Sequence, residues 1–258
     1  MIVRGDGYMY TYLMEHNIIT DCREELPFTA RDNNDVHFFR DKITDIIYAD
    51  KVDKIVDDEL YPKEPTEDDL RRKDQWFNLL KGKRVLDFGC GSGTFVELMQ
   101  DDCRISGYDE YTGDNSEVLH DGYDAITMFH VLEHLREPLK VLAMLNKLLY
   151  YNGLLIIEVP HARDALFSVT EYMKNALWSQ HLIYHTRQSL KTFLYHAGFS
   201  KVEIYGYQRY DLKNHIKWMI DGRESGIPNG IIYQESTDYK KCLYLADRTD
   251  TLIAVASK

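Results

Sequence analysis

The sequence has little of what marks extracellular or membrane-spanning proteins. Its four cysteines, Cys22, Cys90, Cys103 and Cys242, form neither a C-x-x-C pair nor a zinc-ribbon spacing, so we expect reduced thiols and no disulfide framework. No apolar run approaches the roughly 20 residues that a membrane span needs. The N-terminal segment lacks the continuous apolar core of a signal peptide. These absences predict a soluble, cytoplasmic protein with no membrane partner.

Positive charge is also scarce. The 258 residues include 31 basic and 42 acidic side chains, which give a net charge of −11. A negative surface repels phosphate backbones, so we expect no nucleic-acid partner; the only short basic run is Arg71 to Lys73. Apolar residues make up 44% of the chain, which is enough to build a large core.

From residue 81 onward the sequence alternates between strand-like and helix-like segments. Nearly continuous apolar runs, such as residues 154–160, are typical of buried parallel strands. The order predicts a doubly wound, mostly parallel α/β sheet over residues 81–258, with residues 211–247 inserted between its last two strands. Residues 1–80 show patchy helical periodicity and predict an N-terminal helical cap that forms part of the substrate region. Thr66 is a candidate helix N-cap there.

A glycine loop follows the first strand of the predicted sheet. Asp87, Gly89, Gly91 and Gly93 spell D-x-G-x-G-x-G, and glycine lets a backbone turn sharply and approach a ligand closely. A dinucleotide fingerprint needs Gly or Ala three residues after its second glycine, where this chain has Thr94. An NAD(P)-dependent oxidoreductase on a Rossmann-like fold therefore stays only as an alternative.

The segment "VLDFGCGSG" resembles motif I of class I S-adenosylmethionine (SAM)-dependent methyltransferases. The resemblance implies a Rossmann-like, seven-stranded type of sheet, SAM as cofactor and S-adenosylhomocysteine as product. It places the methionine part of SAM on the glycine loop, which includes Cys90, and it places Asp87 near the amino group of SAM. It places the ribose hydroxyls at Asp109, which ends the next strand beside Glu110. Phe129 and His130 then fall at the rim of the cofactor site.

Two later segments extend the resemblance. "YDAITMFHVLEHLREPLKVL" and "HLIYHTRQSLKTFLYHAGF" are similar to a small-molecule branch that includes the ubiquinone O-methyltransferases. Residues 208–230 also resemble a region of some bacterial relatives in carbohydrate biosynthesis. These similarities imply a small-molecule acceptor, a sugar or sugar nucleotide methylated at oxygen, with N- or C-methylation as alternatives. The family normally fits a helix and a strand where this chain has only the short segment 110–122, so one edge strand is expected to be missing or very short.

Histidines near the ends of the predicted strands are candidates for removing a proton from the acceptor. His134, His161 and His181 are the chosen catalytic candidates, because an imidazole can accept a proton near neutral pH and ligands bind at the carboxyl ends of strands in such sheets. His185 lies in the same C-terminal segment as His181. Each of these side chains could instead be a hydrogen-bonded part of the scaffold.

The string "HVLEH" at residues 130–134 also matches the H-x-x-E-H zinc motif of inverzincin peptidases. Pro138 interrupts the helix that such a motif needs, and the preceding glycine loop would have no role in a peptidase. We therefore predict no metal, and keep a divalent cation bound by His130, Glu133 and His134 as an alternative. A protein that binds SAM without catalysis is a further alternative, and the insertion at 211–247 is a candidate homodimer interface.

Overall fold

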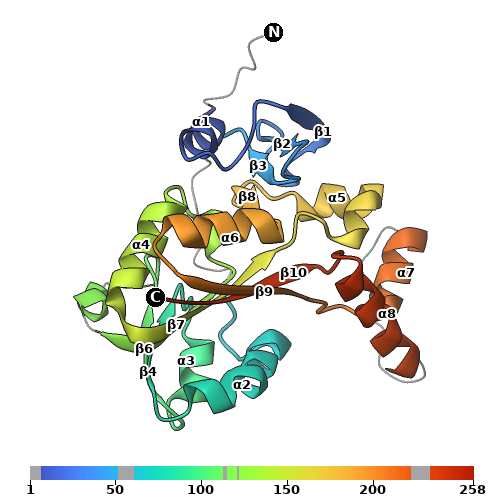
Figure 1. The fold of residues 1–258 in the computed structure, drawn as a ribbon. Helices are drawn as coiled ribbons and strands as arrows, with labels where there is room; N and C mark the ends of the chain where they lie inside the picture. Colours follow the sequence, from blue (N-terminus) through green and yellow to red (C-terminus); the bar gives the residue numbers. More distant parts are fainter. Residues whose placement is uncertain (1–6, 52–60, 113–114, 121, 222–232) are drawn as a thin grey trace.

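A six-stranded mixed sheet forms the centre of the molecule (Figure 1). The structure is a computed structural model that describes residues 7–51, 61–112, 115–120, 122–221 and 233–258. The strand order is β5-β4-β6-β7-β10-β9, in which β4, β5, β6 and β7 are parallel and β10 runs antiparallel to both β7 and β9. The strands are β4 (Arg84–Phe88), β5 (Arg104–Tyr108), β6 (Tyr123–Phe129), β7 (Leu149–Pro160), β9 (Lys201–Tyr207) and β10 (Thr251–Ser257).

The predicted α/β fold is confirmed, with one strand fewer than the seven-stranded type. The described part of the segment after β5 forms only a short 3-10 helix, η2 (Ser116–His120), and β5 is the edge of the sheet. The short linker between Asp109 and Tyr123 leaves no room for a further helix and strand, as its length predicted. The antiparallel β10 makes the sheet mixed.

Helices cover both faces of this sheet (Figure 1). On one face α4 (Pro138–Leu148) and α6 (Arg187–His196) pack buried leucines against side chains such as Ile126 and Ile157. On the other face α2 (Glu67–Leu80) and α3 (Thr94–Met99) pack side chains such as Trp76 against Ala125 and Ile156. Because successive strand residues point to opposite faces, β6 and β7 contribute to both layers.

The N-terminal region is a small antiparallel sheet and not the predicted helical cap. β1 (Arg23–Thr29), β2 (His37–Asp41) and β3 (Ile47–Ala49) pair with one another, next to a single helix, α1 (Tyr8–Glu15). The apolar residues that suggested a helix, such as Phe38 and Tyr48, are aromatic and β-branched types that favour strands. Asp41 fixes the turn between β2 and β3 by accepting hydrogen bonds from the backbone N–H groups of Ile43 and Thr44.

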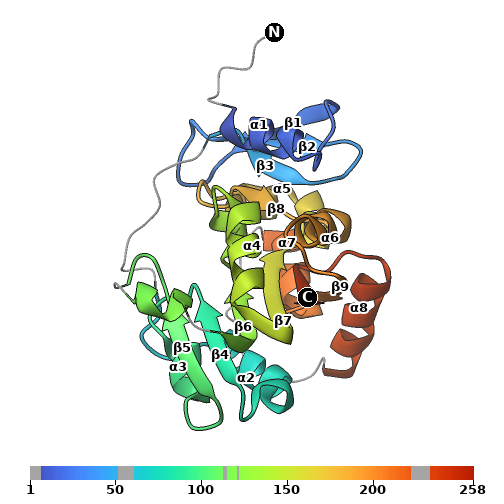
Figure 2. The same cartoon turned by 60° about the vertical axis from the view of Figure 1, so that its left-hand side comes forward.

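A distant segment completes the small sheet. β8 (Ile183–Tyr184) pairs with β3 through Ile47 and Tyr184, which ties the N-terminal residues to the C-terminal half of the chain. Figure 1 and Figure 2 both show this sheet beside β8 and α5 (Thr170–Ala176). Part of the predicted N-terminal helix, residues 52–60, lies outside the described residues.

The remaining helices surround the edge formed by β9 and β10. α7 (Leu212–Asp221) and α8 (Tyr233–Leu245) lie between these two strands in the chain, where an insertion was predicted. Two further 3-10 helices, η3 (Leu132–His134) and η4 (Ala165–Ser168), follow the carboxyl ends of β6 and β7. None of the helices in the described ranges is both long and apolar enough to cross a membrane.

Candidate active site

The glycine loop between β4 and α3 adopts a conformation that glycine favours strongly. Gly89, Gly91 and Gly93 have φ angles of 80°, 54° and 87°, in the left-handed region. A Cβ atom added at Gly89 would also overlap the side chain of Val131, which follows β6. Glycine is therefore required at position 89 for both backbone and packing reasons.

Two carboxylates lie at the ends of the strands on either side of this loop. Asp109, after β5, accepts hydrogen bonds from the backbone N–H groups of Gly91 and Tyr111, each at 2.9 Å. Asp87 lies behind the loop and accepts a 2.7 Å hydrogen bond from the Thr127 hydroxyl. Burial raises the pKa of Asp87 to about 6, because the charged form loses its hydration. Asp109 thus holds the loop directly, whereas Asp87 links β4 to β6 within the sheet.

A hollow of about 560 Å³ opens beside the loop, and we call it the larger hollow. Most of the residues predicted to bind the cofactor line it, and they are Gly89, Cys90, Gly91, Asp109, Glu110, Phe129 and His130. Asp87 and Gly93 do not line it; Gly93 is the N-cap of α3. The predicted catalytic residue His134 lies in its wall as well.

The start of α2 closes one side of the larger hollow. Thr66 caps α2, as predicted, in a reciprocal arrangement with Asp69, whose carboxylate also accepts a 3.0 Å hydrogen bond from Thr94 at the start of α3. Arg72 lines the same wall and lies over the ring of Phe129 at 4.7 Å. Apart from the cap at Thr66, no sequence signal pointed to this wall.

The basic run at Arg71 and Arg72 is an internal clamp, not a surface patch. Both guanidinium groups bind the fully buried carboxylate of Glu158 on β7: Arg71 through two hydrogen bonds of 2.7 and 2.9 Å, and Arg72 through one of 3.0 Å. This network joins α2 to the centre of the sheet beneath the larger hollow. A local spacing could not reveal it, because the partners are 87 and 86 residues apart.

A second hollow, of about 280 Å³, lies next to the first, and we call it the smaller hollow. Trp178 lines both. Aromatic side chains form much of the smaller hollow's wall, with Tyr172 and Trp218 in an edge-to-face contact at 5.2 Å. Its charged residues are Arg31, Asp164, Arg209 and Asp250. Burial raises the pKa of Asp164 to about 7.

The three predicted catalytic histidines fall into a pair and a single residue. His134 and His181 lie together at the boundary of the two hollows, with ring centroids 4.9 Å apart. His161 lies in the wall of the smaller hollow, where its Nδ1 is 2.9 Å from the Thr249 carbonyl oxygen. Burial lowers the pKa of His134 and of His161 to about 4 and that of His181 well below its usual value. His185 lines neither of these two hollows.

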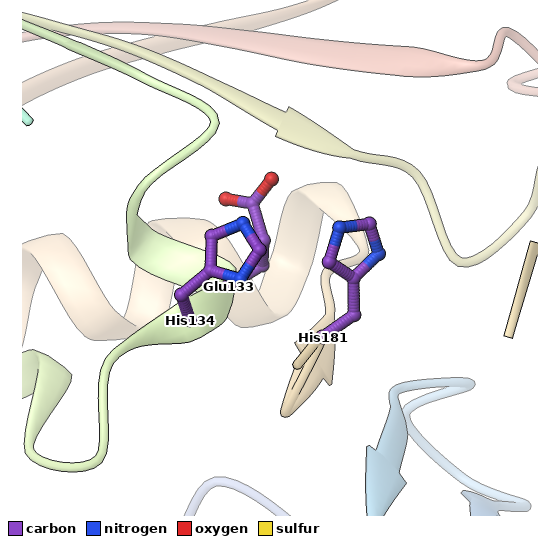
Figure 3. A group of neighbouring side chains, drawn as sticks. All are labelled: Glu133, His134 and His181. Carbon is purple, nitrogen blue, oxygen red and sulfur yellow. The ribbon is translucent and has the colours of Figure 1, made fainter. Parts of the chain in front are cut away.

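The H-x-x-E-H string does not form the helical metal motif that the sequence allowed. η3 covers only Leu132–His134, and His130 before it has a φ of 55°, so the five residues share no helical face. His130 Nδ1 contacts Glu133 Oε1 at 2.9 Å. Among the described residues, the side chains that could hold a metal are instead Glu133, His134 and His181, whose ligand atoms lie within 4.8 Å of one another (Figure 3).

Comparison with known proteins identifies the family. A family model described as "Methyltransferase domain" matches residues 63–204. No curated protein matches the chain significantly. Among solved structures, a SAM-dependent methyltransferase from Archaeoglobus fulgidus is 20% identical with a TM-score of 0.49, and the match covers 73% of this chain and 91% of that one. Phosphoethanolamine N-methyltransferase 2 from Haemonchus contortus is 16% identical with a TM-score of 0.45, over 74% and 52% of the chains.

The family match spans α2, the glycine loop and the strands β4 to β8. It also includes many of the residues that line the two hollows. The match includes the glycine loop and Asp109, which line the larger hollow together. The chain belongs to this methyltransferase family and is a SAM-dependent methyltransferase.

Proposed function

We propose that SAM binds in the larger hollow, with its methionine part along the loop from Gly89 to Gly93. Asp109 is the group that accepts hydrogen bonds from the ribose hydroxyls, because each carboxylate oxygen has a lone pair beyond the one used by Gly91 or Tyr111. The apolar side chains Leu119, Leu135, Val141 and Met144 line the same hollow and would contact the adenine. In this proposal they replace the residues that the missing edge strand would have contributed to the adenine side of the site.

The acceptor, in this proposal, is a small molecule in the smaller hollow that is methylated at oxygen. This assignment rests on Trp178, which lines both hollows and shows that they are adjacent. The two sites must be adjacent because the methyl group passes in line from the sulfur of SAM to an acceptor atom held close to it. Tyr172 and Trp218 offer apolar faces, and Asp250 and Arg209 offer polar contacts. Such a mixture suits a sugar or a sugar-like ring, and a nitrogen or carbon acceptor is the alternative.

His161 is the proposed proton acceptor. A carbonyl oxygen can only accept, so Nδ1 must donate to Thr249, and Nε2 carries a free lone pair. This buried Nε2 has no hydrogen-bond partner among the described residues. Asp247, whose carboxylate is 3.9 Å from it, would stabilise the imidazolium formed when the acceptor hydroxyl loses its proton.

Calorimetry with SAM tests the cofactor site. Asp109→Ala should weaken binding about 10–100-fold, since a hydrogen bond to a charged group contributes roughly 1.5–3 kcal/mol. Asp101→Ala, at an exposed turn, is the matched control and should bind like the wild type. Wild-type protein that binds no SAM, or an Asp109→Ala variant with unchanged affinity, would contradict the assignment.

The release of S-adenosylhomocysteine from SAM tests the acceptor site. A panel of sugars, sugar nucleotides and other hydroxylated metabolites should contain one that stimulates release. With it, His161→Gln should lower kcat about 10²–10⁴-fold and leave the Kd for SAM unchanged. An equal effect on SAM binding would place His161 in the cofactor site instead.

A further inference from the structure

We propose that Glu133, His134 and His181 form a binding site for one divalent transition-metal ion at the boundary between the two hollows. The ligand atoms come from η3 and from the segment before β8, two parts of the chain that are distant in sequence. They lie within 4.8 Å of one another, and Figure 3 shows the three side chains gathered around one space. The set differs from the H-x-x-E-H string, because His181 and not His130 supplies the third ligand.

Hydrogen bonds at Nδ1 of the two histidines leave Nε2 of each ring free to bind an ion. His134 Nδ1 lies 2.9 Å from the backbone carbonyl of Gln180, so it must carry the proton. His181 Nδ1 lies 3.1 Å from the Tyr184 hydroxyl, which itself donates to the Ala176 carbonyl at 2.6 Å and therefore accepts from the imidazole. Both Nε2 atoms are left with lone pairs. Outer hydrogen bonds that fix the tautomer in this way are typical of metal-binding histidines.

Glu133 is the third ligand because one of its carboxylate oxygens makes no hydrogen bond to any described residue. Its carboxylate is completely buried; Oε1 contacts His130, and Oε2 has no hydrogen-bond partner among the described residues. A buried carboxylate oxygen facing neutral imidazoles is costly unless a cation or a proton joins it.

The nearby positive groups do not take the place of the ion. Arg209 approaches His130 Nε2 at 3.5 Å, but its guanidinium is paired with Asp250 and Asp68. Arg72, on the opposite side, is paired with Glu158 and Asp69. The positive charge of each arginine is thus shared with two carboxylates, and neither makes a hydrogen bond to Glu133 among the contacts between described residues.

The donor set indicates the class of ion. Two imidazole nitrogens and one carboxylate oxygen are the ligands of catalytic zinc sites that keep a fourth position open, and the same donors suit Co²⁺ or Fe²⁺. Each imidazole donates from Nδ1 and so offers the lone pair of its Nε2, which is the neutral form that metals bind. His134 and His181 are therefore suited as ligands.

The consequence for catalysis rests on the proposed function. An acceptor oxygen at the open position would have its O–H acidified by the ion. The proton would pass to His161, a new O–CH₃ bond would form, and the electron pair of the broken S–CH₃ bond would stay on sulfur, which leaves S-adenosylhomocysteine. Charge and atoms balance without any oxidant or reductant.

Titration with Co²⁺ alone tests the site, on full-length reduced protein that has been treated with EDTA and then freed of it. Calorimetry should give one ion per chain for the wild type, and visible absorption should report a low-coordinate site of nitrogen and oxygen ligands. His181→Ala and Glu133→Gln should each weaken binding at least about tenfold. His196→Ala, at an exposed histidine on α6, is the control and should bind like the wild type.

Tyr184→Phe keeps all three ligands and removes the hydroxyl that fixes the His181 tautomer, together with the hydrogen bonds of that hydroxyl to the Ala176 carbonyl and the Trp178 N–H. It should weaken Co²⁺ binding about 10–100-fold while circular dichroism shows a folded protein. Wild-type protein without stoichiometric binding, or His181→Ala with wild-type affinity, would overturn the proposal. Because no SAM or acceptor is present, such a result would leave the SAM titration of the cofactor site unaffected.

Discussion

At the scale of single residues, Gly89 shows how local and distant constraints act on one position. Its φ of 80° belongs to the left-handed region, and an added methyl group would meet Val131 from the next strand. Gly82 has a similar φ of 73° but has open space where its Cβ would lie. A comparison of these two glycines therefore separates the effect of backbone strain from the effect of steric overlap.

Alanine at each of these glycines should have different effects. Gly82→Ala should lower the free energy of unfolding by about 1–2 kcal/mol, through left-handed strain alone. Gly89→Ala should cost about 1–3 kcal/mol more, because the overlap adds to the strain, and it should weaken SAM binding by displacing the loop. Urea unfolding and calorimetry measure the two effects.

Val131→Ala provides the check on this explanation. In the Gly89→Ala background it should recover the part of the loss that comes from overlap, giving a favourable coupling energy in a double-mutant cycle. A coupling energy near zero would mean that backbone strain alone explains the effect of Gly89→Ala.

Motif residues were predictable at this scale, whereas residues brought in from elsewhere were not. Asp109 and the loop glycines follow one another at fixed spacing, so the sequence identified them. Trp178, which lines both hollows, carries no such signal. His181 was a candidate for catalysis, yet its neighbour Glu133 was considered only with His130, because sequence spacing showed one segment and not the contact between two.

At the scale of elements, α2 is fixed to the sheet by charge as well as by apolar packing. Trp76 and Leu80 are buried against the sheet, and Arg71 and Arg72 hold Glu158 of β7. Arg71 is mostly buried, and despite the opposing effect of burial its pKa is raised by Glu158 and Asp68. Removing one partner of such a buried pair leaves the other charge without compensation.

Glu158→Gln should therefore lower the free energy of unfolding by about 3–5 kcal/mol. Glu171→Gln is the matched control, because Glu171 pairs with Lys174 on the surface of α5 at 2.9 Å. An exposed pair of that kind contributes about 0–1 kcal/mol. Equal losses in the two variants, measured by urea unfolding, would refute the view that the arginine clamp stabilises the position of α2.

Elements defined by apolar runs were predicted well, and those defined by distant partners were not. β4, β6 and β7 are buried on both faces, so their composition marks them as central strands. The small sheet was predicted as helix because β3 finds its second partner only at β8. The antiparallel direction of β10 likewise depends on the path of α7 and α8, which composition does not encode.

At the scale of the whole molecule, buried titratable groups make stability depend on pH. Burial lowers the pKa of six histidines, namely His130, His134, His161, His181, His185 and His215. Between the lowered values and about 6.5, the unfolded chain binds protons that the folded chain does not. Stability from these groups is present above pH 6.5 and is lost as the pH falls toward 4.

Four acids act in the opposite direction. Burial raises the pKa of Asp87 to about 6, of Asp164 to about 7 and of Glu133 to about 8, and it also raises the pKa of Asp50. The folded chain holds these protons when the unfolded chain has lost them, so they reduce stability as the pH rises from about 4 to 8. Since six histidines outnumber four acids, stability should be greatest near neutral pH and should fall between pH 6.5 and 5.

His185 offers a direct test of this balance, because it packs against Phe193 in the core and lines neither hollow. Burial lowers its pKa to about 3, so the folded protein excludes its proton throughout the acid range. His185→Leu should therefore reduce the slope of unfolding free energy against pH, between pH 4 and 6, by up to about 1.4 kcal/mol per pH unit. His196→Leu, at an exposed position, should leave the slope as in the wild type. Urea unfolding at several pH values measures it, and a His185→Leu slope equal to that of the wild type would mean that His185 takes up its proton without unfolding.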